Sequence, residues 1–78
     1  MLNEREVNKI KEQYPIGTRI ELISMDDPYP VPSGTCGTIC DIDDQGQLDV
    51  KWDNGRTLSL IPNVDKFKVI DIEKNISI

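Results

Sequence analysis

The chain has 78 residues, of which 37% are hydrophobic and 29% charged, and its net charge is −5. This composition is typical of one small folded domain and excludes a disordered chain. No apolar run approaches the ~20 residues that span a membrane, no apolar signal core begins the chain, and the negative charge disfavours non-specific binding to phosphate backbones.

A helix is predicted over residues 3–13, within an N-terminal segment 1–14. Asn3 can cap this helix, and Glu6 stands three residues later, as in a capping box. The apolar positions that would face a core recur at i, i+3 and i+7, and they are Val7, Ile10 and Tyr14. Pro15 ends the helix, because the residue before a proline avoids the helical region.

A strand over Thr18–Ser24 is predicted next, and the stretch Met25–Gly37 follows it with three of the five prolines. Each proline fixes its own φ near −65° and restricts the preceding residue. We therefore expect an extended, stiff run that tends to polyproline II. Asp26, Asp27 and Tyr29 lie on this run. Conspicuous loops on small scaffolds are common binding sites.

Four further strands are predicted, and they are Thr35–Ile42, Gln47–Asp53, Arg56–Ile61 and Lys66–Ile70. Gly37 in the first of these indicates a bulge or a close approach of backbones, and the spacing of Ile39 and Ile42 also fits a bulge. Asn54-Gly55 predicts a two-residue type I′ turn, which needs φ > 0 at both positions. A turn at 43–46 and a short 3₁₀ turn at 62–65 make the remaining connections.

The two cysteines bear on compartment and chemistry. On one strand, Cys36 and Cys40 would have Cα atoms about 13 Å apart, whereas a disulfide needs less than about 7 Å. Zinc needs about four ligands, which two cysteines without histidine do not supply. We expect free thiols in a reducing cytoplasm.

These elements predict one mainly β domain over residues 1–78. Five short strands, a long loop after the first strand and a 3₁₀-like link before the last are the order of a small SH3-like barrel, here over residues 17–70. An OB-fold would have longer strands and a helix where this chain has the turn at Asn54-Gly55. The tail 71–78 alternates Ile72 with charge. It can extend the last strand, pair with an edge or fray, and we expect some packing, on the domain or on another subunit.

Several motifs together resemble those of domain-of-unknown-function family 4314, a small bacterial and phage family. They are Tyr-Pro-x-Gly-Thr-Arg from Tyr14, Met-Asp-Asp-Pro-Tyr from Met25, Pro-x-Gly-Thr-x-Gly from Pro32, Trp-Asp-Asn-Gly from Trp52 and Asp-x-Phe-x-Val from Asp65. The resemblance implies a setting in phages or bacterial mobile elements. It implies no assigned activity.

The sequence favours a non-enzymatic protein without a cofactor or metal. No histidine is present to act as a base near neutral pH, and the cysteines lack a histidine partner. The adjacent carboxylates Asp26/Asp27 and Asp43/Asp44 are typical of turns that cap their own backbone. A cation site formed by these last two residues with Asp41 lacks the spacing and the glutamate of an oxygen-ligand loop.

Binding is therefore the predicted activity. The candidate partner-binding residues come from the proline-rich stretch and from the Trp52–Arg56 hairpin, and they are Met25, Asp26, Asp27, Tyr29, Asp53 and Arg56. Tyr29 is the candidate anchor, although it can also fold back onto the barrel. Trp52 is expected in the core. Arg56 and Arg19 are expected to pair with Asp53 and Glu21 rather than to bind anions.

Three functions remain open. The first is a protein–protein interaction module that grips a partner through the proline-rich stretch. The second is a phage-encoded inhibitor of a host defence protein, acting by its acidic face or by sequestering a ligand. The third is a nucleic-acid or nucleotide binder that would use Lys51, Arg56, Lys66 and Lys68. The sequence favours a protein partner over nucleic acid, no membrane contact, and a monomer or small homo-oligomer.

Overall fold

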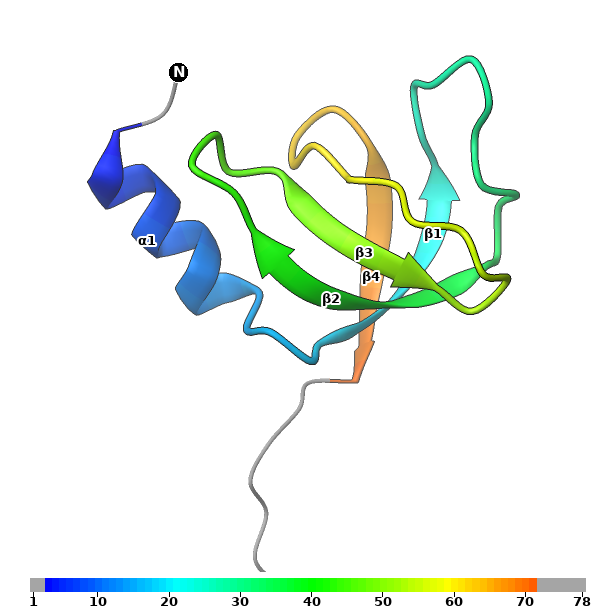
Figure 1. Ribbon diagram of the computed structural model, residues 1–78, viewed down its shortest axis with the longest axis horizontal. Coiled ribbons are helices and arrows are strands. Elements are labelled where there is room, and N and C mark those ends of the chain that lie inside the picture. The colour runs from blue at the N-terminus through cyan, green and yellow to red at the C-terminus, as the bar shows by residue number, and fades with distance from the viewer. Residues whose placement is uncertain (1–2, 72–78) are drawn as a thin grey trace, which may run out of the picture.

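The computed structural model describes residues 3–71 (Figure 1). Its elements are α1 (Glu4–Gln13), β1 (Arg19–Ser24), β2 (Cys36–Ile42), β3 (Leu48–Trp52) and β4 (Lys66–Asp71). The strands form one open antiparallel sheet in the order β3-β2-β1-β4. This confirms a mainly β fold with an N-terminal helix. The part of the tail at 72–78 lies outside the described residues.

The helix begins and ends where the sequence predicts. The Glu6 N–H donates to Asn3 Oδ1 at 2.8 Å, and the Asn3 N–H donates to Glu6 Oε1 at 3.4 Å, which completes a capping box. The helix ends at Gln13, two residues before Pro15. No helix within residues 3–71 is long and apolar enough to cross a membrane.

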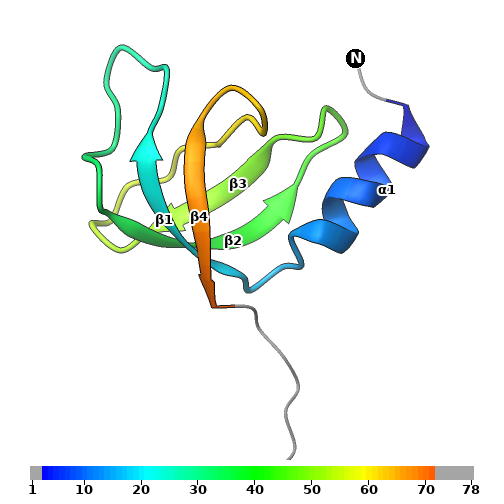
Figure 2. The ribbon, with the colours of Figure 1, turned by 180° about the vertical axis from the view of Figure 1, so that it is seen from behind.

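Both views show a strongly twisted sheet, with α1 at one end of the molecule beside β2 (Figures 1 and 2). The core lies within the curve of this sheet, and α1 adds the partly buried Ile10 at its edge. Its fully buried side chains alternate along β1, β2 and β3, as the period of a half-buried strand requires. Together with Val31 and Leu60 from outside the strands, the buried strand residues form one cluster of Ile20, Leu22, Val31, Ile39, Ile42, Leu48, Val50, Trp52 and Leu60. Tyr14 closes one side of it, with its ring centroid 5.5 Å from that of Phe67.

Gly37 marks a close approach of β2 to β3. A Cβ atom built on Gly37 would lie 2.6 Å from Val50 Cγ1 and 2.8 Å from Trp52 Cε3. Of the two predictions for Gly37, the close approach is therefore confirmed. The bulge lies further along, where the pairing shifts between Ile39 and Asp41.

The predicted strand at 56–61 is not a regular strand. The segment follows β3 but pairs with it only through isolated bridges at Thr57 and Leu60. Between them, the indole Nε1 of Trp52 donates to the Leu58 carbonyl at 3.1 Å, so a side chain occupies an acceptor that a ladder would use. The sheet therefore has four strands and is open, where five strands in a closed barrel were predicted.

The turn at Asn54-Gly55 also differs from the prediction. Gly55 has φ +91°, but Asn54 is not among the described residues with positive φ, so the turn is not type I′. The Gly55 N–H donates to the Trp52 carbonyl at 3.0 Å and the Trp52 N–H to the Arg56 carbonyl at 2.9 Å, the pattern of a type I turn followed by a left-handed glycine. Asn54 Oδ1 accepts from the Arg56 N–H at 3.1 Å, which stabilises this alternative.

Candidate functional site

Residues 25–35 connect β1 to β2 and form a loop, here called the proline loop, that protrudes at one end of the molecule (Figure 1). The loop is not one straight polyproline run, as the sequence suggested, because the chain bends at Pro28 and Tyr29. Asp27 Oδ1 accepts from the Tyr29 N–H at 2.8 Å, and this local bond favours the bend. The Ser33 hydroxyl donates to the Ile23 carbonyl at 2.7 Å and fixes the returning arm.

Asp65 holds the first arm of the proline loop. Its side chain is buried, at 8% exposure. Asp65 Oδ1 accepts from the Asp26 N–H and Oδ2 accepts from the Ile61 N–H, both at 2.8 Å. One carboxylate therefore joins the loop to the turn that precedes β4. Hydrogen bonds to a charged group are the stronger kind, so this contact stabilises both segments.

Arg56, on the turn that follows β3, holds the backbone of the outer part of the proline loop. Its guanidinium donates through Nη2 to the Tyr29 carbonyl at 2.6 Å and through Nη1 to the Pro30 carbonyl at 3.0 Å. The planar fork of arginine suits two adjacent acceptors. The expected pairing of Arg56 with Asp53 is not formed, because both terminal nitrogens are engaged by the loop.

The returning arm is anchored in the core by Val31, which is 2% exposed. The Val31 N–H donates to the Met25 sulfur at 3.3 Å, and Met25 is itself partly buried against the core. Met25 therefore lies at the base of the proline loop, where it supports the returning arm.

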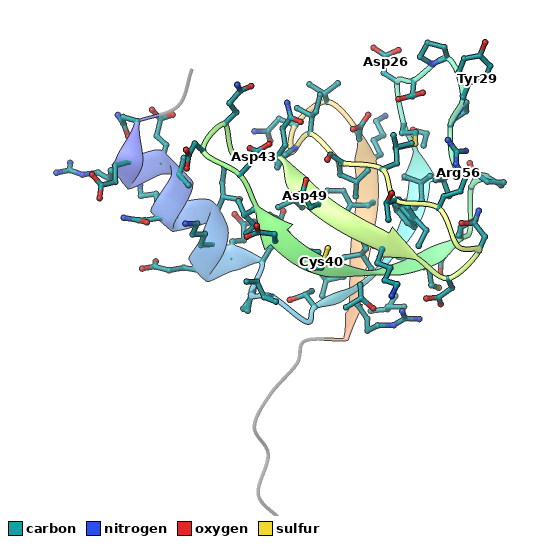
Figure 3. All side chains as sticks on the ribbon, in the orientation of Figure 1. Asp26, Tyr29, Cys40, Asp43, Asp49 and Arg56 are labelled. Carbon is teal, nitrogen blue, oxygen red and sulfur yellow. The ribbon has the colours of Figure 1, made fainter. Side chains whose placement is uncertain are left out.

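Tyr29 is the most exposed large hydrophobic side chain in the described part of the chain, at 79% exposure. Figure 3 places Tyr29 and Asp26 at the outer end of the loop, with Arg56 beneath. The backbone of Tyr29 is held by Asp27 on its N–H and by Arg56 on its carbonyl. Its ring does not fold back onto the domain, so a fixed backbone presents an aromatic ring to solvent.

Asp53 lies on the turn that follows β3, and its side chain bonds to Arg19 of β1 and not to the proline loop. Arg19 donates to it through two parallel bonds, Nη1 to Oδ1 at 2.8 Å and Nη2 to Oδ2 at 2.6 Å. Arg19 Nη1 also donates to Thr38 Oγ1 at 2.9 Å. The hydrogen bonds from Arg19 to Asp53, together with the charge of Arg19, hold the pKa of the Asp53 carboxyl below its ordinary value.

We expect the Asp53→Asn variant to melt at a lower temperature than the wild type at pH 7. A carboxyl whose pKa is lowered by folding contributes stability above its unfolded value of about 3.9, and this contribution is lost as pH falls through the folded pKa. The difference between the two proteins should therefore shrink below about pH 4. Thermal melts from pH 7 to pH 2 test this, and a constant difference would contradict it.

The structure thus brings Asp26, Asp27 and Tyr29 together on the outer part of the proline loop, which Arg56 and Met25 support. Asp53 instead pairs with Arg19. Sequence reasoning missed Asp65 and Val31. The one available signal for Val31 was its position as the aliphatic residue between two prolines in an otherwise polar stretch. No local signal marked Asp65, because its acceptor role depends on a contact 39 residues away.

The fold and this site define a small mainly β domain with a pinned, protruding loop. The chain belongs to the DUF4314 family, whose model, described as a domain of unknown function, matches residues 3–70. This confirms the family resemblance of the sequence motifs. No curated protein and no solved structure matches the chain.

Proposed function

We propose that this domain is a small, non-enzymatic protein-interaction module of SH3-like shape, and that the proline loop is its docking element. The chain order supports the shape: a long loop after β1, turns between β2 and β3, a segment beside β3, and a tight turn before β4. The family resemblance supports an origin in a phage or bacterial mobile element, and the free thiols of Cys36 and Cys40 support a cytoplasmic location.

The observation that carries the proposal is the combination of a fixed backbone and a free ring at Tyr29. A loop that is ordered before binding loses less conformational entropy on binding, so more of the contact energy remains as affinity. Tyrosine is enriched among the residues that dominate protein interfaces. The carboxylates of Asp26 and Asp27 form no ion pair within the described residues, so they are also available to a partner.

The arrangement of cations supports a protein partner over a nucleic acid. Of the four cations that a nucleic-acid site would use, Arg56 is engaged by two carbonyls of the proline loop. Phosphate binding depends on several free cations acting together, and the chain has a net charge of −5. An inhibitor of a host protein would be one form of the proposed module.

The proposal predicts that one defined host protein is captured from a lysate by the immobilised domain, and that Tyr29→Ala weakens this capture about thirtyfold, as for a hot-spot residue. Tyr29→Phe keeps the ring and should bind nearly as the wild type does. Val64→Ala removes an exposed apolar side chain, at 54% exposure, outside the loop and should have no effect. Unchanged capture by the Tyr29→Ala and Asp27→Ala variants would show that the proline loop does not bind the partner.

A further inference from the structure

The outer edge of the sheet offers a second surface that is independent of the proline loop. β4 ends the sheet, and β1 is its one neighbouring strand within residues 3–71. The backbone groups on the far side of β4 have no partner in the described part of the chain. A row of such groups is a template for another extended segment.

The pairing of β1 determines which residues of β4 face this edge. Leu22 donates through its N–H to the Thr35 carbonyl and accepts from the Gly34 N–H, at the end of the proline loop that leads into β2. Because backbone direction alternates along a strand, the preceding Glu21 directs its groups to β4, where it lies opposite Lys68. Phe67 and Val69, on either side of Lys68, therefore direct their N–H and carbonyl groups outward.

The two faces of this edge differ in chemistry. Phe67 and Val69 lie opposite the buried Leu22 and Ile20, so their side chains are on the core face of the sheet. Lys68 lies on the opposite face, and Lys66 shares that face because side chains alternate. A strand added at this edge would therefore meet cations on one face and apolar side chains on the other.

Both faces are accessible. Val69 is 39% exposed, and the side chain of Lys68 is 58% exposed with its ammonium 3.8 Å from Glu21. A pair this open to solvent contributes little, so it does not withhold the lysine from a new partner. One face of this edge thus carries two exposed lysines, Lys66 and Lys68, on a chain whose net charge is −5.

We propose that β4 is a docking edge for an extended segment of another protein in which acidic residues alternate with apolar ones. Carboxylates two residues apart, about 6.6 Å along a strand, match the spacing of Lys66 and Lys68. The intervening apolar side chains would cover Phe67 and Val69, and the outward backbone groups would supply the hydrogen bonds.

Charge separates this occupant from a second copy of the chain. An antiparallel pair of β4 strands related by two-fold symmetry would bring its lysines together, and like charges across strands are destabilising. Lysines on an edge strand also serve in many proteins to prevent pairing altogether. An acidic strand distinguishes a docking edge from an edge that lysines protect against pairing, because only the docking edge binds the acidic strand.

The probe is the peptide acetyl-Glu-Val-Glu-Val-Glu-amide, added to the ¹⁵N-labelled full chain, with acetyl-Lys-Val-Lys-Val-Lys-amide as the matched control. We expect the acidic peptide to shift the amide resonances of Phe67 and Val69 and to slow their hydrogen exchange, and the basic peptide to do neither. Charge reversal by Lys66→Glu with Lys68→Glu should exchange the two preferences while it keeps every backbone donor.

A backbone variant tests the geometry. Val69→Pro removes an outward N–H without removing a bond to β1, so the fold should persist while the acidic peptide no longer binds. Val69→Thr retains the N–H and should bind as the wild type does. Equal shifts with both peptides, no shifts with either, or shifts that depend on protein concentration alone would each overturn the proposal. The last result would assign the edge to a second copy.

Discussion

Replacing Asp65 by alanine is expected to lower the free energy of unfolding by about 3 kcal/mol, the order of two hydrogen bonds to a charged group. The substitution leaves the N–H groups of Asp26 and Ile61 without their acceptors. A domain of this size has roughly 3–5 kcal/mol available from its core, so the variant should be close to unfolding at room temperature. Thermal melting should fall by roughly 10–25 °C.

Two controls separate the hydrogen bonds from the loss of side-chain volume. Asp65→Asn retains one acceptor oxygen in nearly the same volume and should be intermediate. Asp44→Asn changes an exposed carboxylate on the 43–46 turn and should melt as the wild type does at pH 7. A melting temperature of Asp65→Ala within a few degrees of the wild type would show that the buried carboxylate does not hold the two segments.

Replacing Gly37 by alanine is expected to destabilise the domain by about 1–3 kcal/mol, the usual range for overpacking a core. The added methyl group would meet Val50 Cγ1 at 2.6 Å, Trp52 Cε3 at 2.8 Å and the Lys51 carbonyl at 3.1 Å. Since β2 pairs with strands on both sides at this point, the backbone has little freedom to move away.

A double-mutant cycle tests the steric cause directly. Val50→Ala removes the closest atom, so its combination with Gly37→Ala should cost less than the sum of the two single variants. Chemical denaturation of the four proteins gives the coupling free energy. Additive losses would show that the clash with Val50 is not the source of the effect, and an unchanged stability of Gly37→Ala would contradict the close approach.

Local chemistry made several elements predictable. The Asn3–Glu6 capping box, Pro15 and the alternation of apolar residues in β3 act over a few residues, and the structure has all of them where they were expected. The same local logic was wrong for 56–61. Leu58 and Leu60 follow a strand pattern. However, the Leu58 carbonyl accepts a hydrogen bond from the indole of Trp52, six residues before it, and not from a backbone N–H of β3.

The contacts that form the site depend on residues distant in sequence. The exposed tip could be predicted, because prolines and charges at 26–30 keep a chain from the core. The supports could not, because Arg56 reaches carbonyls 26 and 27 residues away and Asp65 reaches an amide 39 residues away. Nothing in the composition of the loop indicates which side chain elsewhere will bond its backbone.

Arg56 holds the backbone of Tyr29 in place while the ring stays exposed to solvent. ¹⁵N relaxation at the Tyr29 amide measures this in the wild type and in Arg56→Ala, with the Val50 amide in β3 as a rigid reference. We expect an order parameter of about 0.85 at Tyr29 in the wild type, equal to that of the reference, and a value below about 0.6 at Tyr29 in the variant. A Tyr29 amide below about 0.6 in the wild type, or unchanged in Arg56→Ala, would contradict it.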